Sequence, residues 1–179
     1  MKKIILVMML AAFTAPVWAQ TEKGDWLVGG SFNLNTSDNN TQISLTPNAA
    51  MFVIKNLAVG GNVTLSYAKE GVIKTTTFGL GPYVRYYFTS ANVRPIVQGN
   101  FNFISSKTKV NNTSSTNNGT NYFLGGGAAI FLSSHVSLDA VLGYDHTKYN
   151  SLPGGGGFAM NIGFQVYLHK RQVDRLRGR

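Results

Sequence analysis

The stretch Phe158-Ala-Met-Asn-Ile-Gly-Phe-Gln-Val-Tyr-Leu168 alternates strictly between two kinds of side chain. The first set is apolar and comprises Phe158, Met160, Ile162, Phe164, Val166 and Leu168. The second set is small, polar or amphipathic and comprises Ala159, Asn161, Gly163, Gln165 and Tyr167. Because successive side chains of a β-strand point to opposite faces, the stretch predicts a strand with one apolar and one uncharged polar face. Its length suits a tilted strand that crosses a bilayer, which takes about 9–11 residues.

The same alternation recurs along the chain before this stretch. It occupies residues 25–35, 42–53, 57–67, 76–88, 93–104, 122–132 and 136–148. Short turns at 54–56, 89–92 and 133–135 interleave with longer polar connections at 37–41, 69–75, 105–121 and 150–157. Short turns on the periplasmic side and longer loops outside are typical of outer-membrane barrels. We therefore predict an all-β fold, an eight-stranded antiparallel transmembrane β-barrel over residues 20–168, with both termini periplasmic.

The polar faces of these segments distinguish a membrane barrel from a soluble one such as a secreted lipid carrier. A strand that faces bulk water tolerates Lys and Glu, whereas Glu22 and Glu70 lie outside the segments and most Lys lie in the connections. Asn, Ser, Thr, Gln and Gly fill the polar faces instead. These residues suit a confined lumen, because an unpaired buried charge costs several kcal/mol.

The chain begins with the pattern of a secretory signal peptide. Two lysines precede an apolar stretch at 4–13, and Val17-Trp18-Ala19 resembles a cleavage site, so residues 1–19 are predicted to be removed. A membrane anchor is the alternative, but the apolar stretch is too short to span a bilayer and Pro16 interrupts it.

The other end is a basic tail, residues 169–179, which either lies against anionic headgroups or forms a disordered end. The two ends carry most of the formal net charge of +9. No basic patch remains on the predicted barrel, so a nucleic-acid partner is not expected. The absence of cysteine excludes disulfides.

Aromatic residues at lipid-facing positions gather near the two ends of the predicted strands. Trp26, Tyr86 and Phe88 fall near the periplasmic ends, and Tyr67, Phe103, Tyr122 and Tyr144 fall near the outer ends. Such rings form two belts at headgroup level in membrane barrels. We predict that these residues contact outer-membrane lipid at its interfaces.

Few charges alternate to the inside of the barrel. The predicted lumen set is Arg85, Asp139, Arg94 and Asp25, with Asp145 nearer the outer end. Arg85 and Asp139 each lie three residues from the periplasmic end of their strand, so they are expected at one depth. An eight-stranded barrel is just wide enough for its side chains to fill it, and the two charges could therefore meet across the lumen. The pair is interpreted either as a buried ion pair that fixes the interior or as a gate on a narrow water path.

No pattern for catalysis, cofactor or metal binding emerges. His135 beside Ser133 and Ser134 is typical of a turn, and no orienting acid accompanies them. Asp145 and His146 are adjacent on one strand and face opposite sides. We therefore expect no enzyme, no cofactor and no metal. The connection 105–121 is rich in Asn, Ser and Thr and is interpreted either as a contact surface for an extracellular ligand or as a solvated loop without a partner, which is the favoured alternative.

Several stretches resemble the small outer-membrane β-barrel family, similar to the membrane domain of outer membrane protein A and its porin-like relatives. They are residues 26–30, NLAVGG at 56–61, GLGPYVRYYF at 79–88, GGGAAIFL at 125–132 and the final strand. The resemblance implies an integral protein of a Gram-negative outer membrane that the barrel-assembly machinery inserts. Many members end on an aromatic residue that this machinery recognises, whereas here the tail follows Leu168.

A peptidoglycan-binding domain, which would imply anchoring to the cell wall, does not follow the predicted barrel. The expected role is structural or interactive through the outer loops. A narrow channel for water or small solutes is the alternative, and a lipid-modifying barrel enzyme is less favoured because no reactive residue is found inside.

Overall fold

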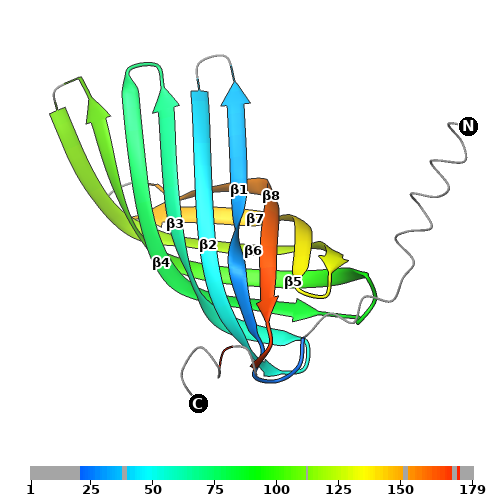
Figure 1. Ribbon diagram of the computed structural model, residues 1–179. Helices are drawn as coiled ribbons and strands as arrows, with labels where there is room; N and C mark the ends of the chain where they lie inside the picture. Colours follow the sequence, from blue (N-terminus) through cyan, green and yellow to red (C-terminus); the bar gives the residue numbers. More distant parts are fainter. Residues whose placement is uncertain (1–20, 38–39, 112, 151–152, 171–172, 174–179) are drawn as a thin grey trace, which may run out of the picture.

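The computed structural model describes residues 21–37, 40–111, 113–150, 153–170 and 173. The predicted signal peptide and most of the predicted tail lie outside these residues. The strands are β1 Trp26–Ser37, β2 Asn40–Ile54, β3 Leu57–Glu70, β4 Ile73–Tyr87, β5 Val93–Val110, β6 Thr113–Ser133, β7 Val136–Tyr149 and β8 Gly155–Leu168. Each pairs antiparallel with its sequence neighbour, and β1 pairs with β8 to close the ring (Figure 1). The prediction of an all-β, eight-stranded antiparallel barrel is confirmed.

The two ends of the barrel differ, and we name them by what they carry. The terminal end holds the start of β1, the end of β8 and the short turns after β2, β4 and β6. The far end holds the hairpins that join β1 to β2, β3 to β4 and β5 to β6 (Figure 1). Among the described residues, no helix has the length and apolarity needed to cross a membrane.

The alternation in β8 sorts its side chains as expected. Phe158 is 84% exposed and Phe164 is 50% exposed, whereas Gln165 and Tyr167 are at most 1% exposed. An outward apolar face and a buried polar face are the reverse of a water-soluble barrel. Exposed large apolar side chains also occur on the seven other strands, so an apolar outer face continues around the ring.

The strands extend further at the far end than composition indicated. The connection 105–121, predicted as the longest loop, is instead the tip of the β5–β6 hairpin, whose ladder continues to the pair Val110↔Thr113. The connection 69–75 is likewise a hairpin with the pair Glu70↔Ile73. Both loop predictions were wrong, because ladder hydrogen bonds to a neighbouring strand outweigh a weak preference for coil. Asn111 (φ 53°) and Gly71 (φ 57°) provide the left-handed turns.

The seam between β1 and β8 is paired over part of its length. The ladder runs from Trp26↔Leu168 to Phe32↔Ile162 and ends there, although both strands continue toward the far end. Beyond it, the Asn33 side chain donates a hydrogen bond to the Met160 carbonyl oxygen at 2.6 Å. Backbone pairing thus closes the ring at the terminal end. Beyond this ladder, toward the far end, the Asn33 side chain links β1 to β8.

Most of the buried apolar core lies toward the terminal end of the lumen. It comprises Leu27, Ala50, Phe52, Ala58, Tyr83, Tyr87, Ile96, Phe123, Ala129, Phe131, Val141 and Tyr167. Gly60 lets β2 approach closely beside this core, because a Cβ there would lie 2.0 Å from the Ala49 carbonyl oxygen. The fold therefore places a packed apolar floor beneath a polar upper lumen.

Candidate functional site

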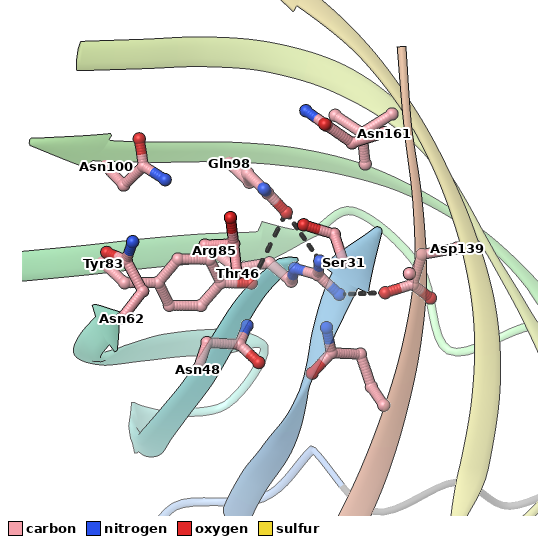
Figure 2. Close-up of a pocket in the computed structure, with 13 residues that line it drawn as sticks. Ser31, Thr46, Asn48, Asn62, Tyr83, Arg85, Gln98, Asn100, Asp139 and Asn161 are labelled. Atoms are coloured by element: carbon pink, nitrogen blue, oxygen red, sulfur yellow. Dashed lines mark hydrogen bonds and ion pairs between the residues drawn. The ribbon is translucent and has the colours of Figure 1, made fainter. Parts of the chain in front are cut away.

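The centre of the lumen holds an ion pair between strands that are not neighbours. Arg85 on β4 and Asp139 on β7 point inward, and Arg85 Nη1 donates to Asp139 Oδ2 (Figure 2). The side chains of the two residues are 3% and 1% exposed. Two strands separate them on one side of the ring and four on the other, so the pair crosses the lumen. The structure brings these two predicted residues together at one depth.

Polar and aromatic neighbours contact the rest of this pair, although Arg85 Nε has no hydrogen-bond partner on the described protein. Arg85 Nη2 donates to Gln98 Oε1 at 2.6 Å, and Ser137 Oγ donates to Asp139 Oδ1 at 2.7 Å. The guanidinium carbon lies 5.7 Å and 5.9 Å from the ring centroids of Tyr83 and Tyr87. Hydrogen bonds and ring faces offset the desolvation of a buried charge. Sequence reasoning missed Gln98, although it stands directly opposite Arg85 in the β4–β5 register.

Four rings fill the lumen on the terminal side of the ion pair. This aromatic block consists of Phe52, Tyr87, Phe131 and Tyr167, each at most 3% exposed. The centroids of Phe131 and Tyr167 are 4.9 Å apart, and those of Phe52 and Tyr87 are 5.9 Å apart. The hydroxyls of Tyr87 and Tyr167 lie within 2.8 Å of each other. The block ties together β2, β4, β6 and β8, so it closes the lumen from four sides.

A large polar cavity lies on the other side of the ion pair. Its volume is about 550 Å³, and its lining includes Ser44, Thr46, Thr64, Ser66, Asn102 and Asn121. Beside Arg85 itself the free space falls to about 10 Å³, the room that about one water needs. Among the described side chains, the buried Oδ1 atoms of Asn100 and Asn102, which line the cavity, have no protein partner. The same holds for amide atoms of Asn48, Asn62 and Gln165 around the small space beside Arg85. Such groups are satisfied by water in a polar cavity, so the upper lumen has the chemistry of a hydrated compartment.

The other two predicted lumen charges are bound at the terminal end. Arg94 is fully buried, donates from Nε to the Ala91 carbonyl at 2.9 Å, and lies 4.2 Å from the ring centroid of Phe131. Asp25 Oδ1 accepts from the Lys170 amide at 3.1 Å and lies 2.6 Å from His169 Nδ1. The start of the predicted tail is therefore attached to the barrel. The predicted set of four charges divides into a central pair and two residues with other partners.

The predicted interface aromatics lie on the outer surface. Tyr67, Tyr86, Phe88, Phe103, Tyr122 and Tyr144 are exposed there, and Trp26 is half-buried. Tyr86 packs edge-to-face on Phe88 at the terminal end, with centroids 5.1 Å apart. At the far end, Tyr122 stacks on His146 at 5.1 Å, a contact that sequence reasoning missed. Two outward aromatic groups thus stand at the two ends of the strands.

Reactive side chains do not gather elsewhere in the described part of the chain. Ser134 Oγ lies 2.8 Å from His135 Nδ1 in the turn after β6. Among the described residues, no group of three or more His, Cys, Asp or Glu side chains could hold a metal ion. The lumen, which holds the ion pair, the aromatic block and the polar cavity, is therefore the candidate functional site.

Comparison with known proteins agrees with this architecture. The family model described as "Outer membrane protein beta-barrel domain" matches residues 5–169. A comparison with curated protein sequences finds no match.

Solved structures show the same fold at low sequence identity. The chain is similar to Neisserial surface protein A, with a TM-score of 0.60 and 17% identity over 80% of this chain and 97% of that chain. It is similar to the N-terminal β-barrel domain of Pseudomonas aeruginosa OprF, with a TM-score of 0.55 and 12% identity over 82% and 98%. It is also similar to Ail, the attachment invasion locus protein of Yersinia pestis, with a TM-score of 0.51 and 13% identity over 82% and 99%. The resemblance noted in the sequence is confirmed, and the chain belongs to the outer membrane protein β-barrel domain family.

Proposed function

We propose that the protein is a non-conducting barrel of the cell outer membrane, with a structural or surface-interaction role through its far-end hairpins. The aromatic block carries this proposal. Its four buried rings, together with the Arg85–Asp139 pair above them, occupy the terminal half of the lumen. Interiors packed in this way leave little space for solutes. The barrel is suited to hold hairpins at a membrane surface rather than to pass solutes.

The length of the β5–β6 hairpin supports a role in contact. β5 has 18 residues and β6 has 21. A crossing strand needs about 9–11 residues, which leaves roughly 7–12 residues, or ~23–40 Å, beyond the membrane. This paired extension presents a firmer surface than a coil of the same composition. It is the proposed contact surface for an extracellular ligand, in place of the loop that composition predicted.

The proposal orients the far end outside and the termini in the periplasm. Short turns at the terminal end and longer hairpins at the far end support that orientation. Insertion by the barrel-assembly machinery belongs to the same proposal, as does the absence of enzymatic activity. Solved neighbours include a surface protein and an attachment invasion locus protein, so the proposed setting has precedent in this fold.

An epitope inserted after Asn111, at the tip of the β5–β6 hairpin, tests the orientation. Antibody should label intact cells that carry this insertion. The matched control carries the same epitope after Arg179 and should be labelled only once the outer membrane is permeabilised. Labelling of the terminal tag on intact cells, with a protected hairpin tag, would reverse the orientation.

A narrow channel for water or small solutes is the second candidate. The polar cavity favours it, because the cavity reaches from the far end down to the lumen centre, where Arg85 and Asp139 form a constriction. Liposome swelling separates the two functions. Under the structural role, vesicles that contain the barrel swell at the rate of protein-free vesicles in a sugar solution. Faster swelling would instead establish the channel.

A further inference from the structure

Three lysines stand side by side on the outer face of the far end. The register places Lys69 on β3 opposite Lys74 on β4, and Lys74 opposite Lys109 on β5. We call Lys69, Lys74 and Lys109 the lysine row. Side chains directly opposite each other on neighbouring strands have Cβ atoms about 4.5–5.5 Å apart, and like charges in these positions are destabilising. A compensating anionic group would therefore stabilise a row of three like charges.

Nothing described on the protein neutralises the row. All three lysines are exposed, and none takes part in an ion pair among the described residues. Glu70 follows Lys69 directly, but strand alternation places it on the opposite face. Lys107, exposed two residues below Lys109 on the same face, adds a further positive charge and stands opposite Thr76. The patch thus combines a cluster of ammonium groups with a neighbouring hydroxyl. It corrects the expectation that the barrel carries no basic patch, because strand pairing joins lysines from three separate strands.

The position of the lysine row along the barrel axis indicates which part of the membrane it contacts. Tyr67 lies two residues below Lys69, which is about 7 Å along the strand. Phe78 lies four residues below Lys74, or about 13 Å. Both rings are exposed on the same outer face. Because outward rings mark the boundary between hydrocarbon and headgroups, the row stands at the height of the headgroups.

We propose that the lysine row binds the phosphate groups of an anionic lipid in the leaflet at the far end. Ammonium groups attract anionic headgroups as point charges and donate hydrogen bonds to phosphate oxygens. The continuity of the row with the lipid-facing aromatic residues selects a lipid rather than a soluble polyanion. The orientation proposed above makes this lipid a phosphorylated glycolipid of the outer leaflet, and that part of the inference rests on the proposed function.

The test measures lipid binding to the folded full chain in neutral detergent by native mass spectrometry. The probes are bis-phosphorylated lipid A and the same lipid with its phosphates removed. The row variant is K69Q/K74Q/K109Q. The matched control is K23Q/K55Q/K148Q, which removes the same charge from exposed positions outside the row. Folding of each variant is checked by its heat-modifiable migration on a gel.

Wild type and the control should bind the phosphorylated lipid in preference to the dephosphorylated one. The row variant should lose affinity by about fivefold per lysine, or on the order of a hundredfold for all three. The variant K69R/K74R/K109R keeps the charge and should bind as wild type does. If the triple variant fails to fold, K74Q removes the central charge alone and should cost about fivefold.

Three outcomes would overturn the proposal. They are equal affinity for the two lipids, equal loss in the row variant and its control, and tighter row-dependent binding of a soluble polyanion such as heparin. Binding in detergent does not depend on which end of the barrel faces outward. A reversed orientation in cells therefore leaves the phosphate result standing, and the two failures remain distinguishable.

Discussion

Replacing Asp139 by alanine leaves the Arg85 guanidinium buried without its carboxylate. Breaking a buried ion pair from one side costs about 3–5 kcal/mol, because the remaining charge is desolvated and uncompensated. Arg85 keeps the 2.6 Å hydrogen bond to Gln98 and the two tyrosine rings. These contacts place the expected loss near the lower value, about 3 kcal/mol. Replacing both partners with apolar residues, Arg85→Met with Asp139→Leu, removes the stranded charge and should restore most of the stability.

Urea unfolding of the barrel in lipid vesicles measures this loss, with Trp26 fluorescence as the signal. For a denaturant dependence of about 1–3 kcal/mol per M, the midpoint of the Asp139→Ala variant should fall by roughly 1–3 M. Glu22→Ala is the control, because Glu22 forms an exposed ion pair with Lys55 at 2.9 Å. Exposed pairs of this kind contribute about 0–1 kcal/mol.

Two results would refute the reasoning on the central pair. In the first, Asp139→Ala unfolds at the wild-type urea concentration, so the pair does not stabilise the barrel. In the second, the double variant unfolds as early as the single one, so the stranded arginine is not the cause. Planar-bilayer recording of the same variants tests the gate interpretation. A structural pair predicts that conductance stays at the wild-type level in all of them.

The other predictions concern packing and the chain ends. Gly60→Ala should lower the free energy of unfolding in urea by about 1–3 kcal/mol. The added carbon would lie 2.0 Å from a carbonyl oxygen of β2. Gly157→Ala is the control and should not lower this free energy, because the space around Gly157 is open. Phe52→Ala removes a ring of the aromatic block and should cost about 3–5 kcal/mol in urea unfolding. If the block seals the barrel, the same variant should also speed liposome swelling, and unchanged swelling would mean that the seal lies elsewhere. Asp25→Asn weakens the contact with the chain after β8, so trypsin should cleave at Lys170 faster than in wild type; an equal cleavage rate would show that this contact does not hold the tail.

The alternation of side chains predicted the ring of strands because it reports the geometry of the strand directly. Period two in 136–148 or 158–168 has no other simple explanation, and β7 and β8 cover nearly the same residues. The far-end extensions of β5 and β6 were missed because Asn, Ser and Thr are common in coil. Their pairing depends on the partner strand, and Asn111, which adopts the positive φ of a turn, was the available signal.

Two features of the sequence predicted part of the candidate site: the alternation that tells which side chains face inward, and the distance of a residue from the end of its strand. Those two quantities placed Arg85 and Asp139 at one level, and the structure joins them. They also placed Arg94 and Asp25 inside the barrel, but not their partners. Arg94 is bound by carbonyl oxygens of the turn before β5, and Asp25 by the chain after β8. Such contacts arise from turns and chain ends, whose conformation cannot be predicted from a periodic pattern of side chains.

The partial ladder between β1 and β8 has a consequence for how the barrel forms. The other strand pairs join neighbours in sequence and can form early, whereas this seam joins residues from opposite ends of the chain, such as Trp26 and Leu168. Bringing distant segments together carries a large entropic cost, so closure of the ring is expected to be the last step. Until that step, β1 and β8 are open edges with an apolar face, a structure that pairs readily with other chains. Closure of the ring and insertion into the membrane must therefore be nearly simultaneous. A ladder as short as the one between β1 and β8 is one that the chain can complete quickly.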